Sequence, residues 1–385
     1  MKVAVPRERR AHETRVAATP DTVKKYVGMG LEVVVEAGAG MAARLPDELY
    51  RAAGASIEAD PASVYRGADI VLKVQRPLVA GEGELDELAL IPKGALLLAV
   101  LSPYNAPDSV PAYAGVGITA MALEFVPRIT RAQGMDVLSS QSNLAGYRAV
   151  LDAAFEYDRA MPMMMTAAGT VAPAKVMVLG AGVAGLQAIA TAKRLGAIVS
   201  ATDVRPAAKE QVESLGGRFV MVESEETKEA ETAGGYAKEM SEDFKRRQAE
   251  LVAETIKSQD IVICTALIPG RKAPTLVNDD MVASMRPGSI IVDLAVEQGG
   301  NCTASRPGEV VEVGGVKVVG HFNVPGRIAT DASALYAKNL LNFLTPLLQT
   351  EDGVSLALDF DDEILAATTL THGGRVTHPA FADNK

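Results

Sequence analysis

Three glycines and one aspartate form the clearest chemical pattern in the chain. Gly180, Gly182 and Gly185 have the spacing Gly-x-Gly-x-x-Gly directly after the apolar run 175–179, and Asp203 ends the next apolar run. In a strand–turn–helix unit this spacing binds the pyrophosphate of a dinucleotide, with an acidic residue about 20 positions further on. The first glycine permits the turn, the second lets the phosphates approach the backbone, and the third lets helix and strand pack closely.

The helix expected at residues 183–195 would point its amino terminus at the phosphates. Its first N–H groups have no partner inside the helix, and the helix dipole adds a partial positive charge. Val183 is its first residue, and Gly196 follows its end. The alternative is an ordinary glycine-rich turn, in a chain with 34 glycines. The strand before the turn, the helix after it and the acidic residue together favour a dinucleotide site.

Asp203 indicates which dinucleotide is bound. A carboxylate at this position accepts hydrogen bonds from ribose hydroxyls and repels a 2′-phosphate, so the sequence predicts NAD(H) rather than NADP(H). Arg205 lies close enough in sequence to attract that phosphate, but we discount this role because the Asp203 carboxylate lies at the strand end and Pro206 directs the chain away. Val204 and Arg205 are retained as candidate nucleotide contacts.

A general acid–base is harder to find. A dehydrogenase that acts on a small substrate usually needs such a group, most often histidine or lysine. None of the four histidines follows the apolar run 95–101. They are His12, His321, His372 and His378. Lys73, near the end of the run 69–74, is the one candidate base, and a lysine held in a salt bridge explains it equally well.

Two series of short strands, alternating with helices, would position these residues. Strands of the first series are expected at residues 2–5, 31–36, 69–74, 95–101 and 118–123. Those of the second are expected at residues 175–179, 198–203, 218–222, 260–265, 289–294 and 316–319. Apolar runs without strict alternation, separated by helices, indicate parallel sheets covered on both faces. The predicted class is α/β, with two doubly wound, Rossmann-like domains.

Two long helices are expected to join these domains, at residues 139–161, ended by Pro162, and at about 332–348. The first domain would then be discontinuous, comprising residues 1–138 plus 328–385. The NAD(H)-binding domain would comprise residues 139–327 with its connecting helix. Ligands of such sheets bind beyond the carboxyl ends of the strands, and we expect the site in a cleft between the domains.

Composition excludes several classes of protein. The net charge of −10 leaves no basic stripe for nucleic acid. With only Cys264 and Cys302 present, we expect neither a disulfide framework nor a thiolate metal site, and no metal. No apolar run approaches the ~18 residues that span a bilayer, and the amino terminus does not read as a signal peptide. We therefore expect a soluble chain.

Seven longer segments are spread over the whole sequence. Four of them are Lys2-Val-Ala-Val-Pro-Arg-Glu, Lys73-Val-Gln-Arg-Pro, Leu267-Ile-Pro-Gly-Arg-Lys-Ala-Pro and Pro287-Gly-Ser-Ile-Ile-Val-Asp-Leu-Ala. They resemble the alanine dehydrogenase and transhydrogenase alpha-subunit superfamily. The other three are the run from Arg128 to Arg148, Thr232-Ala-Gly-Gly-Tyr-Ala-Lys-Glu-Met and His321-Phe-Asn-Val-Pro. These are similar to the NAD(H)-binding component of proton-translocating NAD(P) transhydrogenases.

The resemblance implies a second group of site residues. Arg128, Gln133, Asp136 and Ser139 would form the loop that holds the nicotinamide and its ribose. Arg128 and Gln133 can donate to carbonyl or phosphate oxygens, and Asp136 can accept from ribose hydroxyls. The alternative is a solvated polar loop in which Ser139 is the N-cap of the following helix.

Further candidates lie in and after a long acidic stretch, residues 223–241. Its Gly234-Gly235-Tyr236 segment resembles the family's mobile loop that closes over bound nucleotide, which makes Gly235 and Tyr236 candidates; a plain acidic surface loop is the alternative. Gln248 and Leu267 complete the candidate nucleotide contacts.

One departure separates this sequence from alanine dehydrogenases, which carry a catalytic histidine after the region 95–101. Here the chain reads Val100-Leu101-Ser102-Pro103-Tyr104. This departure removes the pyruvate chemistry. Direct hydride transfer between two nicotinamide rings needs no proton donor, only alignment of the rings and exclusion of water.

The resemblance therefore implies an NAD(H)-binding transhydrogenase subunit that exchanges hydride with NADP(H) on a partner and is coupled to proton movement. It further implies a homodimer that works with an NADP(H)-binding beta subunit and a membrane-spanning proton-channel subunit, on the cytoplasmic side of the bacterial inner membrane. Two alternatives stay open. One is an alanine-type amino-acid dehydrogenase with Lys73 as acid–base, and the other is a catalytically silent NAD-binding module.

Overall fold

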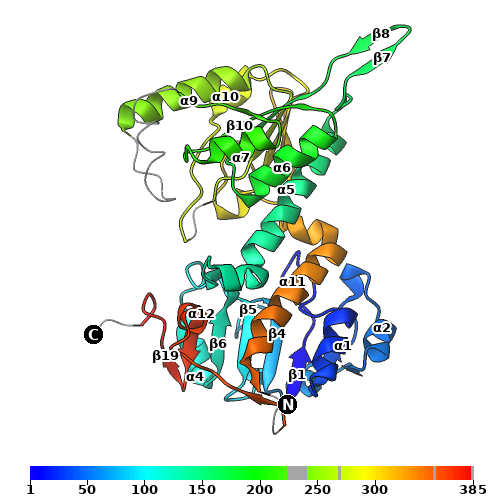
Figure 1. Cartoon of the computed structure of the whole chain (residues 1–385), viewed down its shortest axis with the longest axis vertical. Coiled ribbons are helices and arrows are strands. Elements are labelled where there is room, and N and C mark those ends of the chain that lie inside the picture. Colours follow the sequence, from blue (N-terminus) through cyan, green and yellow to red (C-terminus); the bar gives the residue numbers. More distant parts are fainter. Residues whose placement is uncertain (223–240, 268–269, 350–352, 383–385) are drawn as a thin grey trace. The chain divides into compact units, whose positions relative to one another are not determined.

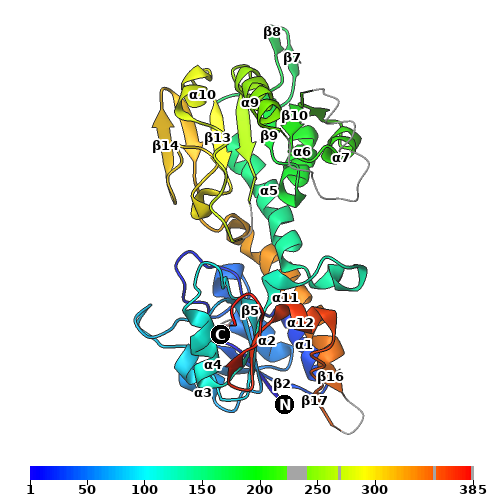
Figure 2. The ribbon, with the colours of Figure 1, turned by 90° about the vertical axis from the view of Figure 1, so that its left-hand side faces the viewer.

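The computed structural model describes residues 1–222, 241–267, 270–349 and 353–382. The chain divides into two compact units, the first formed by Met1–Gln141 with Gly326–Lys385 and the second by Ser142–Pro325. Each unit has a central, mostly parallel sheet with helices on both faces (Figures 1 and 2). The predicted α/β class with two parallel-sheet domains is confirmed.

The sheet of the first unit has eight strands in the described residues, in the order β19-β18-β6-β5-β4-β1-β2-β3. Strands β1 to β6 run parallel, whereas β18 pairs antiparallel with both β6 and β19. The strands are β1 (Lys2–Val5), β2 (Glu32–Glu36), β3 (Ser56–Glu58), β4 (Ile70–Gln75), β5 (Leu96–Val100), β6 (Thr119–Ala122), β18 (Thr369–His372) and β19 (Arg375–Val376).

Helices cover both faces of this sheet, which explains why its central strands are almost continuously apolar. One face packs against α1 (Pro20–Gly28), α2 (Asp47–Ala52), α11 (Ala329–Leu344) and α12 (Glu363–Thr368). The other face packs against α3 (Pro61–Tyr65) and α4 (Ser109–Val116). The buried Tyr336 hydroxyl donates to the carbonyl oxygens of Lys73 at 2.9 Å and Val74 at 3.1 Å, which ties α11 to β4.

The sheet of the second unit has the order β11-β10-β9-β12-β13-β15-β14 in the described residues. Its first six strands are in the doubly wound order 3-2-1-4-5-6, so the order reverses between β9 and β12, where such sheets bind ligands. The strands are β9 (Lys175–Leu179), β10 (Ile198–Thr202), β11 (Arg218–Phe219), β12 (Ile261–Cys264), β13 (Ile290–Asp293), β14 (Val310–Val313) and β15 (Val316–Val319).

Helices α5 (Val137–Glu156), α6 (Val183–Arg194) and α7 (Ala208–Ser214) cover one face of this sheet. Helices α9 (Glu242–Ile256) and α10 (Asp279–Ser284) cover the other.

The expected end of the first long helix is wrong. Helix α5 stops at Glu156, well before Pro162. The Lys317 ammonium group donates to the Glu156 carbonyl at 3.1 Å and to its carboxylate at 3.2 Å, so a lysine side chain satisfies this helix end. The apolar stretch that follows forms a hairpin that was not predicted, made of β7 (Met164–Thr166) and β8 (Gly169–Val171).

Other differences concern element boundaries and one edge strand. Helix α11 begins three residues before the expected start and gives way at Thr345 to a 3₁₀ turn, η7 (Thr345–Leu347). Only Arg218–Phe219 of the strand expected at 218–222 forms. Strand β14 was not predicted, and it pairs antiparallel with β15 because Gly314 and Gly315, both at positive φ, reverse the chain in two residues.

A half-buried carboxylate in the first unit makes its stability depend on pH. Glu124 lies in the 3₁₀ turn η3 (Leu123–Phe125) after β6 and accepts hydrogen bonds from the backbone N–H groups of Leu101, at 3.1 Å, and Ser102. Burial raises the pKa of Glu124 from its ordinary 4.5 to about 7, and these two hydrogen bonds only partly oppose the rise. The folded state therefore keeps a proton that the unfolded state has already released.

The free energy of unfolding should consequently fall as pH rises through the interval between these two pKa values. We expect Glu124 to contribute a loss of about 2 kcal/mol between about pH 5.5 and about pH 8. Urea unfolding of Glu124→Gln should lack this loss, while Glu84→Gln, at an exposed position of the same unit, should keep it. An unchanged pH dependence in Glu124→Gln would contradict the assignment.

Candidate functional site

The turn after β9 is shaped by two glycines that no other residue can replace. Gly180 has φ +101°, and a Cβ on it would lie 2.7 Å from the Thr265 hydroxyl oxygen. That hydroxyl donates to the Gly180 carbonyl at 2.9 Å, which fixes the turn to the end of β12. A Cβ on Gly185 would overlap the Gly180 carbonyl oxygen, because the first turn of α6 packs directly on β9. Both positions match the roles expected from the sequence.

Gly182 faces open space. A Cβ there would meet nothing within 4 Å, and no side chain caps α6, whose N-cap is Gly182. The Gly182 carbonyl accepts the first helical hydrogen bond, from Leu186 at 2.8 Å. Val183, the first helical residue, has 40% of its surface exposed. The geometry therefore presents unpaired backbone N–H groups at a helix amino terminus, which is the arrangement that binds phosphate.

Asp203 is held next to this turn. Its carboxylate accepts from the Ala181 N–H at 2.7 Å and from the Arg205 N–H at 2.8 Å. The Arg205 guanidinium donates to both carboxylate oxygens, at 2.9 and 3.0 Å. Burial raises the pKa of Asp203, but the hydrogen bonds from Arg205 and Ala181 outweigh burial, so this pKa lies below its ordinary value. The Arg205 guanidinium is thus paired with the Asp203 carboxylate, the group that the sequence placed at the strand end.

Exposed apolar side chains accompany these polar groups. Val183, Val204 and Leu267 follow β9, β10 and β12, and they are 40%, 74% and 45% exposed. Because the carboxyl ends of parallel strands share one edge of a sheet, the three lie along the same edge as Asp203. Exposed apolar surface at this edge is typical of a ligand site.

Gln248, also a candidate contact, is engaged within the fold. From α9 its amide nitrogen donates to the Thr202 hydroxyl at 2.9 Å and to the Val220 carbonyl at 3.1 Å. Its amide oxygen accepts from the Val222 N–H at 2.8 Å. Gln248 therefore holds the chain after β10 and β11 in place.

Sequence reasoning missed two buried residues that shape the neighbouring loop. The Asn301 amide donates to the carbonyls of Ala266 at 2.9 Å and Pro274 at 2.8 Å, and accepts from the Ala266 N–H at 3.0 Å. The Asp293 carboxylate in turn accepts from the Asn301 N–H at 2.8 Å and the Ser305 hydroxyl at 2.7 Å. These bonds position the chain that carries Leu267. The available signal was Asp293, a carboxylate that ends an apolar run just as Asp203 does.

The second group of candidates lies in the first unit, in and beside the 3₁₀ turn η4 (Thr130–Met135) that precedes α5. Asp136 accepts from the Ser139 N–H at 2.8 Å and from its hydroxyl at 2.6 Å. Asp136 therefore caps α5, and the alternative in which Ser139 is the N-cap is wrong, since Ser139 lies inside the first turn. An aspartate preceding the first turn accepts the free N–H groups as readily as serine does.

Arg128 and Gln133 are exposed, and their side chains form no hydrogen bond or ion pair with the part of the chain that the structure describes. Both are available to a ligand. Gly235 and Tyr236 lie outside the described residues. The structure thus gathers the phosphate turn, Asp203, Val204, Arg205 and Leu267 at one sheet edge of the second unit. It places Arg128, Gln133, Asp136 and Ser139 in and beside one turn of the first unit.

Lys73 is not available as a catalytic base. It is fully buried, and its ammonium group lies 3.0 Å from the Glu87 carboxylate and 3.4 Å from that of Glu8. Glu87 also accepts from the Tyr65 hydroxyl at 3.2 Å and pairs with Arg9 at 3.3 Å. The salt-bridge interpretation of Lys73 is confirmed.

Two domain families match the chain. The N-terminal domain of alanine dehydrogenase/PNT matches residues 4–145, and its C-terminal domain matches residues 149–379. The chain belongs to the alanine dehydrogenase/PNT family. The family resemblance drawn from the sequence motifs is therefore confirmed, and the nucleotide-binding character of the family agrees with the phosphate turn at Gly180 to Gly185.

Within the alanine dehydrogenase/PNT family, the similarity is greater to transhydrogenases. A relative from Rhodospirillum rubrum, which forms one part of NAD(P) transhydrogenase subunit alpha, is 58% identical over 381 residues, which are 99% of each chain. The crystal structure of transhydrogenase from Sinorhizobium meliloti has 54% identity and a TM-score of 0.87, covering 98% of this chain and 100% of that one. An L-alanine dehydrogenase structure has 28% identity and a TM-score of 0.81, covering 99% of this chain and 98% of the other.

The contribution of Asp203 can be measured by titration. The unmutated chain should bind NADH well and NADPH poorly. Asp203→Asn should weaken NADH binding by roughly 10- to 100-fold, because the amide loses the negative charge and one acceptor for the ribose hydroxyls. Asp280→Asn, at an exposed position of α10, should leave the dissociation constant unchanged. Equal affinities of the unmutated chain for NADH and NADPH would show that Asp203 does not select the cofactor.

Proposed function

We propose that the chain is the NAD(H)-binding subunit of a proton-translocating transhydrogenase. In this role it exchanges hydride directly with NADP(H) bound on a partner subunit. The observation that carries the proposal is a complete phosphate turn with Asp203 in a chain whose one candidate base, Lys73, is buried between Glu8 and Glu87. A site made of positioning groups suits a reaction that needs no proton donor.

The residues fit the nucleotide in two groups. The amino terminus of α6, with the open face of Gly182, would hold the pyrophosphate, and Asp203 the adenosine ribose. Val204 and Leu267 offer exposed apolar surface to the adenine. When bound, NADH supplies the hydride, a proton with two electrons that passes from one nicotinamide C4 to the other.

The loop of the first unit would act at the reacting end of the nucleotide. Arg128 and Gln133 have free donors for carbonyl or phosphate oxygens. Asp136 can accept from the nicotinamide ribose with the lone pairs that Ser139 leaves unused. The closing loop with Gly235 and Tyr236 is part of the proposal, and its evidence is the sequence resemblance alone.

Hydride transfer between NADH and NADP⁺ needs two nucleotide sites, so a chain with one such site requires a partner that carries the other. Gly38 and Gly40 follow β2 but do not form a second phosphate turn, since a Cβ on Gly40 would lie 2.7 Å from the Tyr50 hydroxyl oxygen and the space is filled. No helix in the described part of the chain is long and apolar enough to cross a membrane. On the family resemblance we propose an NADP(H)-binding beta subunit and a membrane-spanning proton-channel subunit as partners, which would hold the chain at the cytoplasmic side of the bacterial inner membrane.

A homodimer is also part of the proposal. The β7–β8 hairpin extends away from the sheet of the second unit (Figures 1 and 2), and Met163, Met164 and Met165 are 59%, 44% and 80% exposed. Phe155, near the end of α5, is 86% exposed. An apolar surface of this kind is typical of an interface, and a second copy of the chain is the occupant that the family resemblance implies.

The test of the function is a reconstituted assay. The chain should reduce an NADP⁺ analogue with NADH only when the NADP(H)-binding and membrane subunits are added, at rates in the ordinary enzyme range of about 1–1,000 per second. The chain alone should show no turnover with NAD⁺ and L-alanine or with NADH and pyruvate. Alanine-dependent NADH production would favour an alanine-type dehydrogenase. A chain inert with every partner would favour the silent NAD-binding module.

The variant Gln133→Asn should show whether Gln133 acts in nucleotide binding or in hydride transfer. Gln133→Asn retracts the amide by about 1.5 Å on covalent geometry. If the amide orients the nicotinamide, a misplacement of this size should lower the transfer rate roughly 100-fold with little change in NADH affinity. The same substitution at Gln211, exposed on α7, serves as the control. If Gln133→Asn weakens NADH binding in proportion to the rate, Gln133 is an ordinary binding residue.

A further inference from the structure

In the 3₁₀ turn η4, the residues that anchor the turn to the first unit lie on different sides from the exposed residue Gln133. A 3₁₀ helix has about three residues per turn, so residues three apart share one side. Ala132 is buried and Met135 packs beside it against the core of the first unit. Arg131 and Gly134 share a second side. Gln133 lies on the third side, which is exposed. Contacts that fix the first two sides therefore determine where Gln133 lies.

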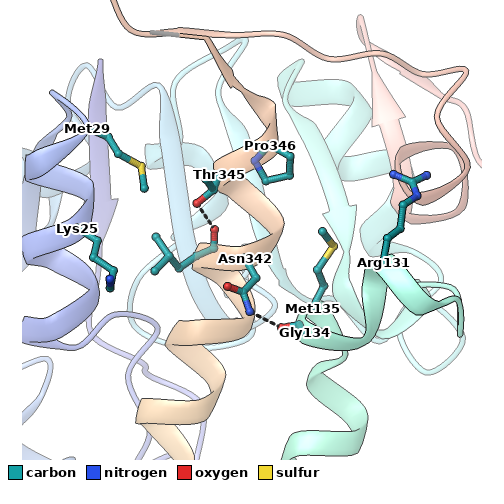
Figure 3. A pocket seen from close by; sticks show the side chains of 9 residues that line it. Lys25, Met29, Arg131, Gly134, Met135, Asn342, Thr345 and Pro346 are labelled. Carbon is teal, nitrogen blue, oxygen red and sulfur yellow. Dashed lines mark hydrogen bonds between the residues drawn. The ribbon is translucent and has the colours of Figure 1, made fainter.

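The second side is fixed by α11. The Gly134 carbonyl accepts two hydrogen bonds, from the Asn339 amide at 2.8 Å and from the Asn342 amide at 2.8 Å. Figure 3 shows Asn342 reaching from α11 toward Gly134. A carbonyl oxygen has two lone pairs, so both are engaged. Arg131 adds ion pairs with Asp362 at 2.7 Å and Glu363 at 3.3 Å, but its side chain is half exposed, and such surface pairs are weak.

Two further observations show that the local structure favours the hydrogen bonds from Asn339 and Asn342 to the Gly134 carbonyl. A Cβ on Gly134 would lie 2.9 Å from the Asn342 amide nitrogen, so the absence of a side chain lets that amide approach. The buried Asn339 has its amide oxygen engaged by the Ser140 hydroxyl at 2.7 Å, which leaves its nitrogen directed at Gly134. Helix α11 thus carries two donors whose common acceptor is the residue next to Gln133.

We propose that Asn339 and Asn342 are positioning residues that hold the Gln133 side chain in its reactive place by fixing the Gly134 carbonyl. The inference rests on the proposed function, in which Gln133 orients the nicotinamide. Neither asparagine needs to touch the nucleotide. Their effect on the reaction passes through the backbone of η4, so it should appear in the rate of hydride transfer and not in the affinity for NADH.

The variants Asn339→Asp and Asn342→Asp test this directly. Aspartate has nearly the same shape and still accepts from Ser140, but it cannot donate to the Gly134 carbonyl. With the reconstituted partners we expect each variant to lose about 10-fold in transfer rate and the pair to lose about 100-fold, with less than about a 3-fold change in NADH dissociation constant. Gly134→Ala should behave like Asn342→Asp. Lys338→Ala, at an exposed position of the same helix, is the control.

A double-mutant cycle distinguishes positioning from general stability. If the asparagines act through Gln133, adding Asn342→Asp to Gln133→Ala should slow transfer no further. A loss that adds fully to that of Gln133→Ala, or full transfer rates in both aspartate variants, would overturn the inference. Urea unfolding of each variant checks that the fold is retained.

Hydrogen exchange provides a readout that does not depend on the proposed function. The backbone amides of residues 130–136 should exchange at least about 10-fold faster in the double aspartate variant than in the unmutated chain. If the unmutated chain transfers no hydride with its partners, the proposed function fails while this measurement still tests the anchor. Unchanged exchange in the variant would overturn the anchoring role itself.

Discussion

The contact between the Gly180 carbonyl and the first turn of α6 is the constraint on which the nucleotide site depends. The absence of a side chain at Gly185 lets helix and strand meet there, and the Thr265 hydroxyl holds the same carbonyl from β12. With the helix seated in this position, its free N–H groups point to the carboxyl edge of the sheet. The Ala181 N–H then reaches Asp203 at 2.7 Å, so one close approach places both the free N–H groups proposed to hold phosphate and the carboxylate proposed to hold the ribose.

The first unit is organised around buried charge rather than around a catalytic base. Lys73, Glu8, Glu87 and Arg9 meet near the carboxyl end of its sheet, where many enzymes of this architecture bind substrate. A buried ammonium group paired with two carboxylates costs much to separate, because each charge would be left without a partner. This arrangement opposes the interpretation of Lys73 as an acid–base.

Local rules in the sequence predicted the sheets and the phosphate turn well. Strand β15 forms at the residues expected, and Gly180 to Asp203 lie as their spacing requires. The predictions that failed concerned features fixed by contacts between residues far apart in the sequence, which a local sequence pattern does not reveal. Helix α5 ends at a carbonyl bound by Lys317, and the anchors of Gln133 come from α11, some two hundred residues away. No pattern near Glu156 or Gly134 predicts such partners.

The pairing of Arg205 with Asp203 has a consequence for how the proposed cofactor preference of this chain could be changed. The carboxylate accepts from two nitrogens of the guanidinium fork, so a full cation at the candidate ribose position is engaged within the chain. Replacing the carboxylate by a neutral group removes the repulsion of a 2′-phosphate and releases a guanidinium in the same step. If Asp203 selects the cofactor as proposed, one substitution would therefore suffice both to admit a 2′-phosphate and to provide a cation for it.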